Sequence, residues 1–273
     1  MSWLSVRVVP AQERDAAMAA LFASGAQGVH EDGDALVTHF PPESDIEAVA
    51  TAVRDADPGA DITVGRASDT DWSEAWKNLL GTQVVGALRI APPWLATGLD
   101  PSRTVVVDPG MAFGTGDHPT TRSVVRLMQR LPLEGARVAD LGAGSAVLAI
   151  AAAKLGARTV TAVELDPDAI GNANENVERN GVADIVHVVE GDALLLLPLI
   201  APVDVIFANI VSSVHKDLVP VMARAMSDGG HAILSGILVE ERGMMSEMLV
   251  TSGWQIDDED IEDIWGSATI SRR

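Results

Sequence analysis

Residues 138–147 read Val-Ala-Asp-Leu-Gly-Ala-Gly-Ser-Ala-Val, an apolar strand pattern that ends in glycines and leads directly into an apolar helix. Gly142 and Gly144 allow the backbone to turn tightly and to approach a ligand where a Cβ would clash. A dinucleotide-binding turn has a third glycine, which brings a pyrophosphate onto the helix N-terminus. Val147 occupies that third position, and Asp140 adds a carboxylate just before the turn. The turn therefore favours a cationic or zwitterionic ligand over a phosphate.

Strand and helix patterns alternate along the rest of this region. The strand patterns cover residues 138–140, 159–165, 185–189, 203–208 and 232–235, and the helix patterns cover 147–155, 167–180, 213–226 and 240–252. Strands that alternate with helices and are apolar on both faces indicate a parallel, doubly wound α/β sheet of the class I, Rossmann-like type.

The first part of the chain has a different order of elements. The predicted elements are a strand at 3–9, a helix at 11–24, a hairpin from 28–30 to 35–40, a helix at 45–55 capped by Ser44, and a strand at 61–64. This βαββαβ order is typical of a ferredoxin-like α+β domain. We expect that domain at 1–68, a linker helix and loop at 69–95 with Trp72 and Trp76 on one helical face, and the cofactor-binding domain at 96–273. The first domain could recognise a partner, or it could be a regulatory or structural appendage.

Further acidic residues follow the next two strands. Glu164 ends the second strand, 22 positions beyond Gly142, where an acid accepts hydrogen bonds from both hydroxyls of a ribose. Asp166 is expected to cap the helix that begins at Pro167. Asp192 follows the third strand and could accept from an adenine amine, or be a solvated turn residue. S-adenosylmethionine carries a sulfonium, an amino group and no phosphate, so the combination favours a methyltransferase over a nicotinamide-dependent dehydrogenase.

Charge and composition restrict the partners. The formal net charge is −20, with 39 acidic and 19 basic residues, which disfavours direct binding to nucleic acid and suits a basic protein partner; the acidity could also serve solubility alone. The chain has no cysteine, and its histidines show no pair at metal-ligand spacing, so no metal site is expected. It has no apolar run near the roughly 20 residues that span a bilayer. We expect a monomeric, cytoplasmic protein without a membrane association.

Residues 108–121 read Asp-Pro-Gly-Met-Ala-Phe-Gly-Thr-Gly-Asp-His-Pro-Thr-Thr. This segment resembles the signature that precedes the core in the PrmA family of bacterial ribosomal protein L11 methyltransferases. The resemblance extends through Asp140-Leu-Gly-Ala-Gly-Ser, Val163-Glu-Leu-Asp-Pro, Ala208-Asn-Ile, the Asp71-Trp-Ser-Glu-Ala-Trp linker and residues 265–272. It implies S-adenosylmethionine-dependent methylation of lysine side chains or the N-terminal amine of a basic ribosomal protein of the large subunit, which the ferredoxin-like domain would recognise.

The resemblance also implies site residues. Cofactor contacts would come from Thr121, Gly142, Glu164 and Asn209, with walls from the loop residues Phe113, Gly114, Thr115 and Gly116. Two positions depart from the family. The family usually has Gly where Ala146 stands and commonly Asp where Glu164 stands, so a methyl group would lie close to the cofactor and the ribose contact would be one methylene longer.

The expected catalytic residues are Asn209, Phe113 and His118. Asn209 ends the fourth strand, where a doubly wound sheet places its chemistry, and its side-chain oxygen can orient an attacking amine or cap the following turn. His118 could wall the amine site, assist deprotonation or be structural. The acidic residues 257–263 could contact a basic substrate or form a solvated loop. A related methyltransferase for another protein or a small amine, and a cofactor-binding module without turnover, remain as alternatives.

Overall fold

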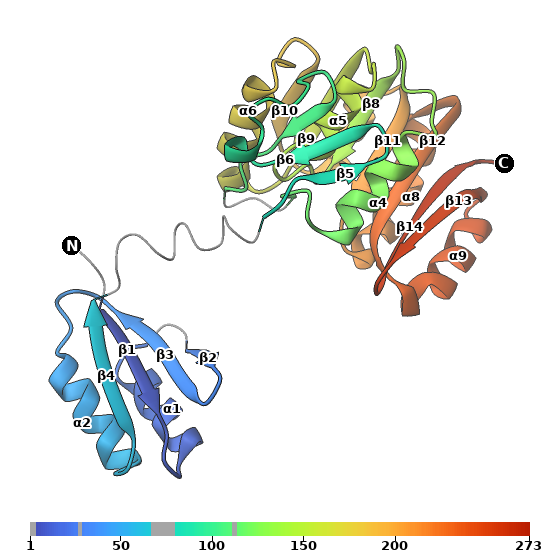
Figure 1. Ribbon diagram of the computed structural model, residues 1–273. Helices are drawn as coiled ribbons and strands as arrows, with labels where there is room; N and C mark the ends of the chain where they lie inside the picture. The colour runs from blue at the N-terminus through green and yellow to red at the C-terminus, as the bar shows by residue number, and fades with distance from the viewer. Residues whose placement is uncertain (1–3, 27–28, 67–79, 111–113) are drawn as a thin grey trace. The chain divides into compact units, whose positions relative to one another are not determined.

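The computed structural model describes residues 4–26, 29–66, 80–110 and 114–273 (Figure 1). The chain divides into two compact units, Met1–Leu79 and Leu80–Arg273. The predicted helix with Trp72 and Trp76 lies outside the described residues. None of the helices in the described ranges has the length and apolar character that a membrane crossing requires.

The first unit is a four-stranded antiparallel sheet with two helices. Its elements are β1 (Leu4–Val9), α1 (Arg14–Ala23), β2 (His30–Asp32), β3 (Ala35–Phe40), α2 (Ile46–Ala56) and β4 (Asp61–Arg66). The sheet order is β2-β3-β1-β4, which confirms the ferredoxin-like prediction. Val6, Leu21, Phe40 and Val53 are buried together between sheet and helices. The cap of α2 differs from the prediction, because Asp45 rather than Ser44 accepts the hydrogen bond from the Ala48 amide.

The second unit is built on a seven-stranded sheet. Its strands are β8 (Arg137–Leu141), β9 (Thr159–Glu164), β10 (Val186–Glu190), β11 (Val203–Asn209), β12 (Met226–Leu238), β13 (Trp254–Glu262) and β14 (Trp265–Arg272). They lie in the order β10-β9-β8-β11-β12-β14-β13. The first five run parallel, and β14 is antiparallel to β12 and β13. This topology confirms the doubly wound, Rossmann-like prediction.

Helices cover both faces of this sheet (Figure 1). The helices on one face are α4 (Pro119–Met128), α5 (Val147–Lys154) and α6 (Pro167–Arg179); those on the other are α7 (Ala193–Ile200), α8 (Ser212–Ala225) and α9 (Arg242–Thr251). A 3₁₀ helix, η3 (Val239–Glu241), precedes α9. Each face of the sheet packs against its own buried cluster of apolar residues. The ends of the strands lie between these two clusters and can form a binding site.

Residues 80–95, which the sequence analysis assigned to the linker, contain β5 (Gln83–Val85), β6 (Leu88–Ala91) and η2 (Pro93–Leu95). With β7 (Thr104–Val106), β5 and β6 form a small sheet. Leu88 and Ile90 are buried in the same cluster as α4 and α5. The second unit therefore includes this segment.

The acidic residues 257–263 form most of an edge strand, so the alternative of a solvated loop is wrong. The strand is β13, which pairs with β14 and contains a register shift between Ile256 and Asp258. Trp254 and Ile256, before the shift, pack with α9 residue Leu249. Beyond it, Asp260 contacts Arg126 of α4 and Asp258 contacts Arg130, which follows that helix.

Candidate functional site

A cavity of about 470 Å³ lies at the carboxyl ends of β8, β9 and β11. The lining residues are His118, Thr120, Gly142, Gly144, Glu164, Asp166, Ala169, Asn209, Ile210, Val211, Gly236 and Trp265. They come from elements that are far apart in sequence but meet at one edge of the sheet. This is the edge where doubly wound sheets bind their ligands.

One side of the cavity, which we call the turn wall, consists of Gly142, Gly144 and Glu164. Both glycines have positive φ, 72° and 52°, and a Cβ on Gly142 would come within 2.6 Å of Ile210 Cγ2. Glu164 Oε2 accepts from the Gly144 amide at 2.7 Å, and its Oε1 accepts from the amides of Leu165 and Asp166 at 2.8 and 2.9 Å. Backbone hydrogen bonds therefore hold the carboxylate against the turn.

Asp140 lies behind the turn wall and does not line the cavity. Its Oδ2 accepts from the Ala149 amide at 3.0 Å, while its Oδ1 is buried with no hydrogen-bond partner among the described residues. Burial, with a smaller contribution from the nearby Glu164 charge, raises the pKa of Asp140 to about 7, against the opposing effect of the Ala149 hydrogen bond. Ala146 is also fully buried, with φ of 64°, so its methyl group packs in the core and not in the cavity.

Asn209 and the two residues after it line the middle of the cavity. Asn209 is the last residue of β11 and pairs with Ser235 of β12. No side-chain hydrogen bond involves Asn209 within the described ranges, so the amide is available to a ligand. Nε2 of the buried His215 ring forms a hydrogen bond with the Ser235 carbonyl at 2.9 Å. This bond holds β12 in place beside Asn209.

The other side of the cavity, the hairpin wall, consists of His118 and Trp265. His118 is the N-cap of α4; its Nδ1 lies 2.7 Å from the Thr120 hydroxyl and accepts from the Thr120 amide at 3.3 Å. The Trp265 ring meets the His118 ring edge to face, with centroids 5.3 Å apart. Burial lowers the pKa of His118, and the Arg122 charge lowers it further. Sequence reasoning missed Trp265, because nothing local distinguishes it from a core aromatic.

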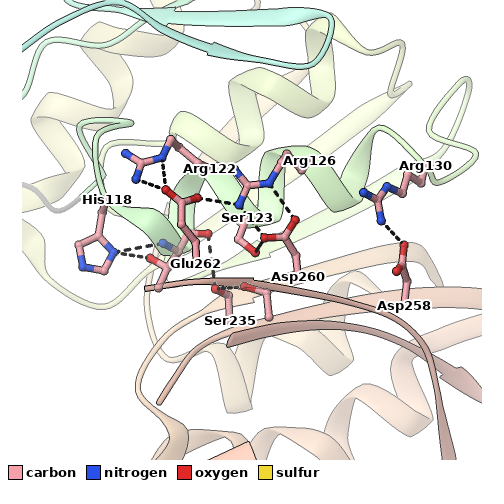
Figure 2. Close-up of polar contacts among 11 residues, drawn as sticks. His118, Arg122, Ser123, Arg126, Arg130, Ser235, Asp258, Asp260 and Glu262 are labelled. Carbon is pink, nitrogen blue, oxygen red and sulfur yellow. Dashed lines mark hydrogen bonds and ion pairs between the residues drawn. The ribbon is translucent and has the colours of Figure 1, made fainter. Parts of the chain in front are cut away.

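Figure 2 shows the charged contacts that join α4 to β13 beside the hairpin wall. Arg122 bonds Glu262, Arg126 bonds Asp260 and Glu262, and Arg130 bonds Asp258. Arg122 and Arg126 are four helix residues apart, a rise of roughly 6 Å, and Glu262 and Asp260 are two strand residues apart, roughly 6.6 Å, so these two ion pairs match in spacing. Arg130 forms the third pair just beyond the end of α4. We call these three rungs the ladder. Arg122 also donates to the Asp117 carbonyl, next to His118.

The ladder lowers the pKa of two carboxyl groups, those of Asp260 and Glu262. Hydrogen bonds from Arg126 lower the pKa of Asp260, and those from Arg122 lower the pKa of Glu262. The outermost pair of the ladder is the most exposed. The side chains of Arg130 and Asp258 are 55% and 39% exposed, whereas those of Arg122 and Glu262 are 20% and 27% exposed and those of Arg126 and Asp260 are 31% and 13% exposed. The two pairs nearer the hairpin wall are therefore more sheltered than the third.

The remaining predicted site residues that the structure describes do not line the cavity. Thr115 and Gly116 are not among the lining residues, and a Cβ on Gly116 would meet Ile90. Thr121 is buried, and its hydroxyl has no hydrogen-bond partner in the described part of the chain. Asp192 caps α7 by accepting from the Leu194 amide at 2.8 Å. Phe113 lies outside the described residues.

The cavity fits S-adenosylmethionine and does not fit a dinucleotide. Its volume lies within the range of small-molecule sites, roughly 300–1,000 Å³. Among the described residues its lining includes two carboxylates and an amide but no lysine or arginine, which suits a sulfonium cation and leaves a pyrophosphate unpaired. Asp166 caps α6, as the sequence predicts, by accepting from the Asp168 amide at 2.9 Å. Glu164 is thus the acid that can face a ribose.

Known proteins agree with this assignment. The family described as "Ribosomal protein L11 methyltransferase (PrmA)" matches residues 3–273. Curated relatives with that name come from Bacillus cereus strain Q1, 35% identical over 90% of this chain and 83% of the relative, and from an Exiguobacterium species, 38% identical over 75% of this chain and 66% of the relative.

A solved structure also matches. The ribosomal protein L11 methylase of Lactobacillus delbrueckii subsp. bulgaricus superposes with a TM-score of 0.64 at 31% identity, over 71% of this chain and 100% of the other. These findings confirm an S-adenosylmethionine-dependent methyltransferase. The chain belongs to the ribosomal protein L11 methyltransferase (PrmA) family.

Proposed function

We propose that this chain transfers methyl groups from S-adenosylmethionine to amino groups of ribosomal protein L11, on lysine side chains, the N-terminal amine or both. The observation that carries the proposal is the cavity between the turn wall and the hairpin wall, with the Asn209 amide between them. The relatives' names supply the protein substrate. The acidic surface of the chain, at a net charge of −20, suits a basic partner.

The cofactor supplies an electrophilic methyl group on a sulfonium, and the residues of this chain position the amine. Gly142, Gly144 and Glu164 would hold the cofactor on the turn wall. Asn209 accepts an N–H of the attacking amine and thereby aims the nitrogen lone pair at near-attack distance. A lysine must first lose its proton, and apolar surroundings such as Trp265 and Ile210 lower its pKa. No dedicated base is required.

We assign His118 to the wall of the amine site rather than to proton transfer. Its Nδ1 is engaged by Thr120, and its lowered pKa keeps the ring neutral near pH 7. A neutral ring packed edge to face against Trp265 is compatible with a cationic cofactor, whereas an imidazolium would repel it. The ring therefore shapes the site and excludes water.

We further propose that the ferredoxin-like unit recognises the protein substrate, and that the enzyme acts as a cytoplasmic monomer without contacting nucleic acid directly. The free face of a βαββαβ sheet can hold a partner. A chain beginning at Leu80, where the second unit begins, should keep its cofactor affinity but lose methylation of the intact protein. Full activity of that shortened chain would contradict the recognition role.

The proposed function is tested with labelled cofactor and purified L11, followed by mass spectrometry. In the same assay Asn209→Ala should lower single-turnover methyl transfer at least about tenfold, or roughly 1.4 kcal/mol. Its cofactor affinity should fall only modestly, because the turn wall is intact. A melting curve excludes damage to the fold. Unchanged transfer would remove Asn209 from the mechanism.

Other outcomes point to the alternatives. Methylation of other proteins but not L11, in a lysate with labelled cofactor, would identify a related methyltransferase with another substrate. Cofactor binding without methyl release under any condition would indicate a binding module. Calorimetric titration with both cofactors should show binding of S-adenosylmethionine and none of NAD.

A further inference from the structure

A second hollow adjoins the methyl-transfer cavity. It lies between η3 and the β13–β14 turn, measures about 510 Å³, and is lined by Leu238, Val239, Glu240, Asp263 and Ile264. We call it the tip groove. Gly236 and Trp265 line the cavity, and Leu238, the strand partner of Trp265, lines the groove. The same two strands therefore run from one hollow into the other.

The tip groove presents apolar side chains to solvent. Ile264 is 63% exposed and Val239 is 40% exposed. Ile264 is the second residue of the two-residue turn between β13 and β14, and the first, Asp263, has a φ of 55° that non-glycine residues rarely adopt. Backbone outliers of this kind occur at ligand clamps and functional sites. Here the strained turn holds a β-branched hydrophobic residue in water, at the edge of a reaction cavity.

Hydrogen bonds fix the groove on both sides. The Val239 amide donates to the Ile264 carbonyl at 2.9 Å. Glu241 accepts from the Leu238 amide at 3.1 Å and from the Ser212 hydroxyl at 2.8 Å, which anchors η3. On the other side, Glu262 at the base of the turn is paired with Arg122. A groove that is already rigid loses little conformational entropy when a partner binds.

The charges in the groove are negative and lack a partner. Glu240 and Asp263 are exposed, and neither forms a hydrogen bond or an ion pair with the part of the chain that the structure describes. The neighbouring Arg242 is engaged by Glu259, at 2.7 Å. Two carboxylates beside two apolar side chains complement a segment that carries both basic and apolar side chains.

We propose that the tip groove seats an extended, basic segment of the protein substrate, next to the amine that enters the cavity. Apolar side chains of that segment pack on Val239 and Ile264, and a lysine or arginine lies between Glu240 and Asp263. The inference rests on the proposed function, because it extends the acceptor side of the same site. It places part of the substrate specificity in the catalytic unit itself.

The test uses the full chain and four groove substitutions in two pairs. Val239→Ser with Ile264→Ser removes the apolar contacts. Glu240→Gln with Asp263→Asn removes the charges, and asparagine tolerates the positive φ of the turn. Leu195→Ser with Leu199→Ser, and Glu178→Gln with Asp184→Asn, are the matched controls on exposed positions of the second unit. KM and kcat are measured with intact L11, and cofactor affinity is measured separately.

We expect the apolar pair to raise KM for L11 by about fivefold or more, since each exposed side chain would be buried in the complex. We expect the charge pair to raise KM by about threefold at low salt and to flatten its salt dependence. In both cases kcat at saturation and cofactor affinity should stay at the wild-type values, and the control pairs should behave as the wild type.

Each contrary result has a distinct meaning. If the wild type methylates L11 and the groove variants keep its KM, the docking proposal is overturned while the proposed function stands. An equal rise in KM for the control pairs also overturns it. If the wild type neither binds nor methylates L11, both fail together. A dimer in sedimentation experiments that dissociates with Ile264→Ser would assign the groove to a second copy of this chain.

Discussion

The turn wall and the hairpin wall enclose one cavity but are held by different forces. Backbone amides hold Glu164 and the glycine turn, whereas paired charges hold α4 against β13 (Figure 2). The pKa values of carboxyl groups near the two walls are also shifted in opposite directions. Behind the turn wall, burial raises the pKa of Asp140, while beside the hairpin wall arginines lower the pKa of Asp260 and Glu262. The cofactor side and the acceptor side therefore respond differently to pH and salt.

The direction of each response follows from linkage between ionisation and folding. A carboxyl group with a raised pKa stabilises the fold fully below its unfolded-state pKa, and that contribution is lost as the pH rises to the folded-state value. For Asp140 the window runs from 3.8 to about 7. The contribution of Asp260 and Glu262, whose pKa values are lowered, is present above their unfolded-state values of 3.8 and 4.5 and is lost as the pH falls.

The largest expected effect comes from Asp140→Asn. The amide oxygen can still accept from the Ala149 amide, but the residue no longer ionises in the core. Relative to the wild type, the variant should gain free energy of unfolding between pH 4 and pH 8, by up to about 4 kcal/mol. Urea unfolding at a series of pH values measures this gain. A constant difference between the two proteins would show that Asp140 does not titrate in this window.

Glu164→Ala should affect the turn wall alone. Removing the carboxylate takes away the proposed ribose acceptor, so S-adenosylmethionine affinity should fall by about 1–3 kcal/mol. Calorimetric titration measures the change, and it should vary little with salt. Glu164→Asp keeps a carboxylate at the strand end and should retain most of the binding. An undiminished affinity in the alanine variant would place the ribose elsewhere.

Arg126→Ala tests the hairpin wall. It removes the ion pair of Asp260 and leaves Glu262 with Arg122 alone, and should cost about 1–2 kcal/mol of folding free energy, less at high salt. Arg130→Ala, two residues beyond the end of α4, removes an exposed ion pair worth about 0.2–1 kcal/mol. Urea unfolding of both variants at low and high salt gives the comparison. Equal losses of folding free energy in the two variants would show that burial near the cavity does not strengthen an ion pair.

The smallest effect is expected at the turn itself, with Ala146→Gly. Alanine at a φ of 64° is strained, and glycine would remove the strain but increase the entropy of the unfolded chain. The two terms nearly cancel, so the free energy of unfolding should change by less than about 0.5 kcal/mol. Ala152→Gly in the middle of α5 should cost about 1 kcal/mol or more. A large loss from Ala146→Gly would show that the methyl group matters in the core.

Sequence predicted the turn wall better than the hairpin wall because the turn wall is local. The strand, the glycines and the helix lie within ten consecutive residues, and Glu164 ends the next strand. Trp265 lies far along the chain from His118, and only the sheet order brings them together. The ion pairs of the ladder could not be predicted for the same reason, because an acidic run in the sequence does not show which arginines it contacts in the fold. For Asp140 the pattern gave the position but not its burial.

The register shift at Asp257 controls which way the edge strand presents its side chains. Even-numbered residues before it, Trp254 and Ile256, pack toward α9. Even-numbered residues after it lie on the other face, where Asp260 contacts Arg126 of α4 and Asp258 contacts Arg130 just beyond that helix. Because strand side chains alternate, pairing Asp257 instead of Asp258 with Thr269 would exchange the faces of all later residues and turn Asp258 and Asp260 toward Met245 and Leu249. The one extra residue in this strand therefore keeps its arginine-paired carboxylates on the side of the hairpin wall.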